Sequence, residues 1–147
     1  MLLGGQACIL YGAAEFSRDL DLLILLSSDN LARFQSLLSD LEAHVVAVPP
    51  FSADYLERGH FVHFRCARPD VAGVRLDVAT RLRGVAGFDE LWERRETFEL
   101  PDLGPVDVLA LGDLVTSKKT QRDKDWVMLR RLLEVDYFRY RASPPAG

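Results

Sequence analysis

The stretch GGQACILYGAAEFSRDLDLLI, residues 4–24, carries most of the information about the fold. Its first part is apolar between Gly4-Gly5 and Gly12, which predicts a short buried helix entered through a Gly-Gly turn. Residues 19–28 begin with alternating polar and apolar side chains and continue as an apolar run, a pattern typical of a strand covered on both faces in its later part. Because side chains alternate along a strand, Asp19 and Asp21 should point to the same face.

Hydrophobic periodicity predicts the elements that follow this stretch. Apolar side chains repeat at intervals of three and four over residues 28–43, which indicates an amphipathic helix with Ser28 or Asp29 as its N-cap. Residues 60–67 and 73–79 each alternate and are separated by turn-forming residues, so they should pair as an antiparallel hairpin. Short helices are predicted over 88–95, 111–120 and 124–133, and short strands over 45–48, 97–100 and 106–109.

The 147 residues have the composition of one ordinary globular domain, with 48% hydrophobic and 27% charged side chains. No internal repeat, low-complexity segment or linker divides the sequence. We therefore expect a single α+β domain in which helices cover a mixed β-sheet. This domain should span residues 1–136, with basic C-terminal helices over 110–134, and a C-terminal tail should follow over 137–147.

Composition also indicates the cellular compartment and the classes of partner. The longest uncharged apolar run, residues 22–28, is far shorter than the roughly 20 residues of a membrane span, and no basic segment precedes Gly4 as in a signal peptide. Cys8 and Cys66 have no metal-ligand spacing and suit a reducing compartment. We expect a cytoplasmic protein without a membrane partner. Its net charge of −4 also disfavours non-specific nucleic-acid binding by the acidic body.

Three aspartates suggest a metal site. Asp19 and Asp21 form an Asp-x-Asp pair, which taken alone is more often the polar start of a strand. Asp77 lies in a second alternating strand between apolar residues, where an unpaired charge is costly, so a cation should face it. Carboxylate oxygens are ligands that Mg²⁺ prefers. The three carboxylates therefore predict a Mg²⁺ site.

These segments together resemble the nucleotidyltransferase superfamily, whose fold is shared with DNA polymerase beta. The family signature is Gly-Gly or Gly-Ser, a helix, Asp-x-Asp, and a third Asp on a neighbouring strand; residues 4–24 and VRLDV at 74–78 match it. The segment LALGDLVTSKKTQRDKDWVMLRRLLE, residues 109–134, is similar to the C-terminal helices of a small bacterial branch that includes abortive-infection-type toxin nucleotidyltransferases. The resemblance covers roughly residues 3–134.

The resemblance implies transfer of a nucleoside monophosphate from an NTP to a hydroxyl acceptor, with two Mg²⁺ ions. The acceptor stays open between RNA, a protein and a small molecule. The resemblance assigns catalysis and metal binding to Asp19, Asp21 and Asp77, and nucleotide binding to Gly4, Gly5, Ser17, Lys118 and Arg122.

An alternative function is open at this point. Glu15 is acidic where relatives usually carry a basic residue, and an acid there would repel phosphates. The chain would then be a catalytically degenerate member of the same fold. It would act as a binding or toxin–antitoxin component, with a second copy or an antitoxin-like protein as its partner.

Overall fold

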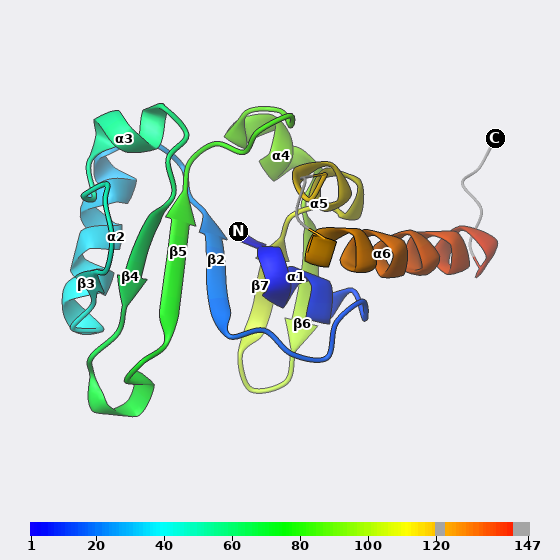
Figure 1. The fold of residues 1–147 in the computed structure, drawn as a ribbon, viewed down its shortest axis with the longest axis horizontal. Helices are drawn as coiled ribbons and strands as arrows, with labels where there is room; N and C mark the ends of the chain where they lie inside the picture. Colours follow the sequence, from blue (N-terminus) through cyan, green and yellow to red (C-terminus); the bar gives the residue numbers. More distant parts are fainter. Residues whose placement is uncertain (120–122, 143–147) are drawn as a thin grey trace.

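A seven-stranded mixed sheet forms the centre of the structure, a computed structural model that describes residues 1–119 and 123–142, without the side chains of 123–125 (Figure 1). The strand order is β3-β4-β5-β2-β1-β7-β6. β2 pairs with β5 and β1 with β7 in parallel, and the other neighbours are antiparallel. The strands are β1 (Leu2–Leu3), β2 (Asp19–Leu23), β3 (His44–Val45), β4 (Val62–Arg65), β5 (Arg75–Ala79), β6 (Glu96–Leu100) and β7 (Gly104–Val108).

Helices cover both faces of this sheet, which confirms the α+β class. The helices are α1 (Gly4–Leu10), α2 (Ser28–Asp40), α3 (Ala53–Glu57), α4 (Phe88–Arg94), α5 (Leu111–Ser117) and α6 (Asp123–Ala142), with a 3₁₀ turn, η1, at Pro69–Val71. Within the described part of the chain, no helix combines the length and the hydrophobicity that crossing a bilayer requires.

Two apolar clusters lie on opposite faces of the sheet because side chains alternate along β2 and β5. On one face, Phe34 of α2 and Leu56 of α3 pack with Phe64 and Leu76. On the other face, Leu23 and Ala79 at the ends of β2 and β5 pack with residues of α1, α4, α5 and α6. The residues that precede Leu23 and Ala79 on this second face are polar, so the functional candidates adjoin the second cluster.

The predicted strand over 19–28 and the predicted N-cap of the next helix need correction. β2 ends at Leu23, and Ile24 makes the last ladder contact, donating from N–H to the carbonyl of Ala79 at 2.9 Å. β5 ends at Ala79, so the later apolar residues have no strand to pair with. The N-cap of α2 is Ser27, whose Oγ accepts from the amide of Asn30 at 3.3 Å.

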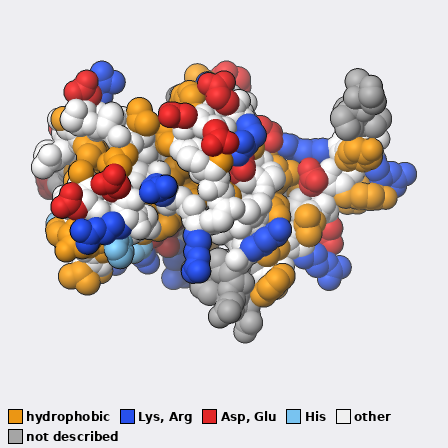
Figure 2. All heavy atoms as spheres, turned by 90° about the horizontal axis from the view of Figure 1, so that it is seen from above, with side chains coloured by type: hydrophobic (Ala, Val, Ile, Leu, Met, Phe, Trp, Pro, Cys, Tyr) orange, Lys and Arg blue, Asp and Glu red, His pale blue; other side chains and the backbone are white. Residues whose placement is uncertain are grey.

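The C-terminal segment also differs from the prediction. The predicted helix over 124–133 continues to Ala142, so residues 137–142 are helical and only the remainder of the tail lies outside the described residues. No Gly or Pro interrupts the sequence before Pro144, so nothing in it ends the helix earlier. α6 projects from the sheet in Figure 1, and hydrophobic side chains lie between basic ones at that end of the molecule in Figure 2. α3 was not predicted, whereas the hairpin of β4 and β5 was.

Candidate functional site

The predicted carboxylates lie on adjacent strands of the sheet. Asp21 of β2 is directly opposite Asp77 of β5, and Asp19 is opposite Arg75. Because the members of each strand pair are two residues apart, all four side chains point to the same face. Parallel pairing of β2 and β5 therefore brings together two residue pairs that are more than fifty positions apart in the sequence.

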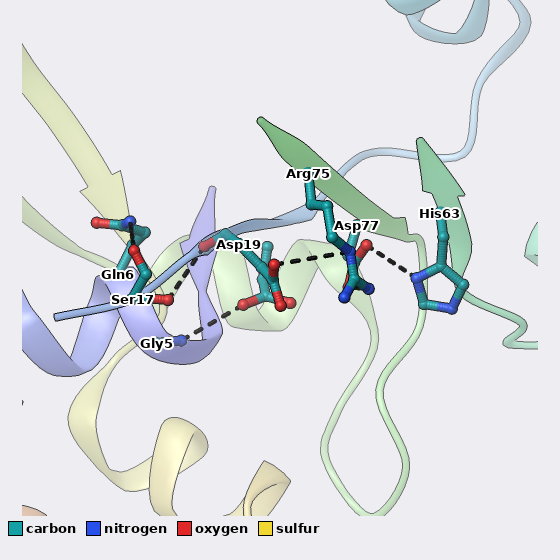
Figure 3. A network of polar contacts seen from close by, with 8 residues as sticks. Gly5, Gln6, Ser17, Asp19, His63, Arg75 and Asp77 are labelled. Carbon is teal, nitrogen blue, oxygen red and sulfur yellow. Dashed lines mark hydrogen bonds and ion pairs between the residues drawn. The ribbon is translucent and has the colours of Figure 1, made fainter. Parts of the chain in front are cut away.

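Asp77 is the most buried of these carboxylates, with 7% of its surface exposed. His63 of β4 lies opposite Asp77, and its Nδ1 is 2.8 Å from Asp77 Oδ1 (Figure 3). Both atoms are buried, and neither has a partner with hydrogen-bond geometry. Asp77 Oδ1 therefore faces an imidazole nitrogen across the pairing of β4 with β5.

Arg75 supplies the cation that the sequence led us to expect beside Asp77. Its Nε is 3.6 Å from Asp19 Oδ1, and its Nη2 is 3.4 Å from Asp77 Oδ2. In Figure 3 its guanidinium lies between Asp19 and Asp77. One side chain thus bridges carboxylates from two strands.

The Gly4-Gly5 turn approaches the same carboxylates from α1. The amide of Gly5 donates to Asp21 Oδ2 at 3.4 Å. Gly4 has a φ of 66°, and a Cβ at this position would overlap the Asp21 carboxylate. A Cβ at Gly5 would overlap the side chain of Ser17. Both glycines are therefore required by close contact, and this contact is with residues of the predicted site.

Ser17 holds the segment that leads into β2. Its Oγ donates to the carbonyl of Asp19 at 3.2 Å, and its own carbonyl accepts from Gln6 Nε2 at 3.3 Å (Figure 3). These two hydrogen bonds connect α1 to the start of β2. They fix the position of Asp19 relative to the Gly4-Gly5 turn.

Among the three carboxyl groups of the site, Asp21 has a pKa that its surroundings shift. Burial raises the pKa of Asp21 above its ordinary value, and the nearby carboxylates of Asp77 and Asp19 raise it further. The amide of Gly5 and the ammonium of Lys118 act in the opposite direction. Lys118 is therefore close enough to influence this carboxylate.

The predicted basic residues are only partly described. Lys118 is partly buried and is the C-cap residue of α5, whereas Lys119 is exposed. α5 ends at Ser117, before the predicted residue 120, and α6 begins at Asp123. Arg122 itself lies outside the described residues.

The donor set suits Mg²⁺ because it consists of carboxylate oxygens, one of them buried without a hydrogen bond. Because Gly4 has no side chain, the Asp21 carboxylate can lie directly against the start of α1. Among the residues that the structure describes, no three His, Cys, Asp or Glu side chains are close enough to hold a metal as they stand. Carboxylate binding of a metal therefore requires rearrangement around Arg75.

Sequence reasoning missed His63 and Arg75. His63 could not be found from its spacing, because its position opposite Asp77 depends on how β4 pairs with β5. Arg75 could have been found, since it lies two residues before Asp77 and so shares its face.

A separate hollow of the described structure lies away from the carboxylates. It has a volume of about 840 Å³ and lies between α5 and α6, where Val115, Trp126, Leu129, Leu133 and Tyr137 line most of it. This groove is apolar and open, unlike the charged cluster on β2 and β5.

Comparison of the chain with protein-family models found no match, and a search of curated proteins found none either. Function must therefore be inferred from the residues and their geometry.

Proposed function

We propose that this protein is a minimal nucleotidyltransferase, which transfers a nucleoside monophosphate from an NTP to a hydroxyl acceptor. The observation that supports the proposal best is the register of β2 and β5. It places Asp21 opposite Asp77 on one face, next to a glycine turn that has no room for side chains. The resemblance of residues 4–24 and 74–78 to that superfamily agrees with this arrangement.

Asp19, Asp21 and Asp77 would hold two Mg²⁺ ions. When bound, such ions lower the pKa of an attacking hydroxyl and neutralise charge on a leaving pyrophosphate. Asp77 is the residue we assign to accept the hydroxyl proton, because its carboxylate lies opposite that of Asp21 on the same face of the sheet.

The phosphates would be bound where the start of α1 and the segment before β2 approach the carboxylates. In this structure the Gly5 amide donates to Asp21 Oδ2 and the Ser17 hydroxyl donates to the Asp19 carbonyl; both donors would turn to phosphate oxygens once the carboxylates hold metal. Lys118 adds a positive charge that already influences Asp21. A role for Arg122 rests on the sequence resemblance alone.

Calorimetric titration with Mg²⁺ and a non-hydrolysable NTP tests this function without knowledge of the acceptor. The wild type should bind Mg-NTP, and Asp77→Asn should bind it at least tenfold more weakly, since it removes a charged ligand. Glu99→Gln, which removes an exposed carboxylate on β6, is the matched control and should leave binding unchanged. Absence of binding by the folded wild type would exclude the proposal.

A second candidate function is a non-catalytic binding component, with a second copy or an antitoxin-like protein as its partner. The exposed side chains of α6 favour it: Trp126, Tyr137, Phe138 and Tyr140 are each more than half exposed. Exposed aromatic surface of this kind is typical of interaction sites. This function would be preferred if Mg-NTP does not bind.

A further inference from the structure

We propose that Arg75 is a built-in counter-ion of the carboxylate cluster, which occupies the place of a metal ion and must be displaced before metal binds. The inference rests on the proposed function, because it concerns the control of the same site. Arg75 would set the metal concentration at which the site becomes loaded.

The contacts of Arg75 are those expected of a cation held by two acids. Its Nε and Nη2 lie 3.6 Å from Asp19 and 3.4 Å from Asp77, on two different strands. The register places Arg75 opposite Asp19 and two residues before Asp77, so its side chain emerges among three carboxylates. The backbone of the sheet therefore determines that a guanidinium lies here.

The burial of the cluster explains why a counter-ion is needed. The side chain of Asp77 is only 10% exposed; His63 faces its Oδ1 at 2.8 Å, and Arg75 is the cation that faces its Oδ2, where an uncompensated charge is costly. Crowding of Asp19, Asp21 and Asp77 adds repulsion between like charges. A metal ion relieves both costs, and so does Arg75. The guanidinium and a metal therefore compete for the same oxygens.

Displacement of Arg75 is sterically possible. Its side chain is 40% exposed, and that of Asp19 is 34% exposed, so the guanidinium can move to solvent while its aliphatic part stays on β5.

The test measures binding of Mn²⁺ alone, followed by the electron paramagnetic resonance signal of the free ion, and uses no nucleotide. Arg75→Gln should bind Mn²⁺ about tenfold more tightly than the wild type, since an opposing charge is removed. The control is Arg65→Gln, which removes an exposed positive charge opposite Arg75 on β4 and should change affinity less than about twofold. In metal-free buffer Arg75→Gln should melt below the wild type, and saturating Mn²⁺ should remove this difference.

The outcomes separate this inference from the proposed function. If the wild type binds Mn²⁺ and Arg75→Gln binds it equally, Arg75 is not a competitor, although the nucleotidyltransferase proposal stands. Equal gains in Arg75→Gln and Arg65→Gln would mean a general field effect and would also overturn the inference. If neither the wild type nor Arg75→Gln binds Mn²⁺, this inference fails, and the Mg-NTP titration alone decides the proposed function.

A second variant covers the case in which Arg75→Gln does not fold without metal. Arg75→Lys keeps the charge, but an ammonium lacks the planar fork that contacts two carboxylates at once. It should therefore bind Mn²⁺ about threefold more tightly than the wild type. An affinity no higher than that of the wild type would overturn the inference.

Discussion

Asp21 and Asp77 lie directly opposite each other on two parallel strands, with both carboxylates on the same face of the sheet. Burial raises the pKa of Asp21, and the charge of Asp77 raises it further. An acid whose pKa is raised by folding stabilises the fold below its unfolded pKa, and this stabilisation is lost as the pH rises through the folded value. Asp21 therefore makes the protein less stable at neutral pH than in mild acid.

Asp21→Asn should accordingly raise the melting temperature at pH 7 by about 2–4 °C. The asparagine carbonyl still accepts from the Gly5 amide, while the repulsion is gone. The difference in melting temperature between Asp21→Asn and the wild type should disappear below pH 3.8, the ordinary pKa of Asp21. Thermal melts from pH 3 to 8, with Glu99→Gln as control, measure this. An advantage that does not change with pH would contradict the electrostatic cause.

Gly4→Ala should destabilise the protein by about 2 kcal/mol or more, because Gly4 has a positive φ and an added Cβ would overlap the Asp21 carboxylate. Gly112→Ala is the matched control: it lies in α5, where a Cβ meets nothing within 4 Å, and alanine there should stabilise by about 0.5–1 kcal/mol. Urea unfolding measures both. Similar effects at the two positions would show that Gly4 is not closely packed against Asp21.

Lys118→Ala should weaken Mg-NTP binding about tenfold, because a charge-assisted contact to phosphate is lost. Lys118 is partly buried and acts on Asp21, whereas Lys119 is exposed. Lys119→Ala should therefore change the affinity by less than twofold. Titration calorimetry compares the two neighbours. Equal losses would indicate a diffuse basic patch, and no loss in either would place the nucleotide elsewhere.

Arg139 connects the C-terminal half of α6 to the body of the protein. Its Nη1 is 2.9 Å from Glu96 Oε2 on β6, and its guanidinium lies 4.9 Å from the ring centre of Tyr11. Arg139 and Glu96 are 44% and 38% exposed, so the pair should contribute only about 0.2–1 kcal/mol. A double-mutant cycle with Arg139→Ala and Glu96→Gln measures this coupling. Zero coupling would show that α6 is not held against β6 by this pair.

The sequence alone determined several features of this protein. Period-two alternation placed Asp19 and Asp21 on one face, and turn chemistry indicated the hairpin of β4 and β5. Both features depend only on residues close together along the chain, because alternation is a property of the extended backbone and a hairpin is set by its turn residues. The α+β class followed from the same patterns. The ends of elements were less certain, as the shorter β2 and the longer α6 demonstrate.

Only the tertiary structure decided which side chains meet. Strand register places Asp21 opposite Asp77, Arg75 opposite Asp19 and His63 opposite Asp77. A shift of one residue would turn every one of these side chains to the other face, so composition and spacing leave this choice open. Packing settles it, because the alternate residues Leu20, Leu22, Leu76 and Val78 must reach the apolar cluster under α2. Burial of that apolar face is what brings the charged residues together on the opposite one.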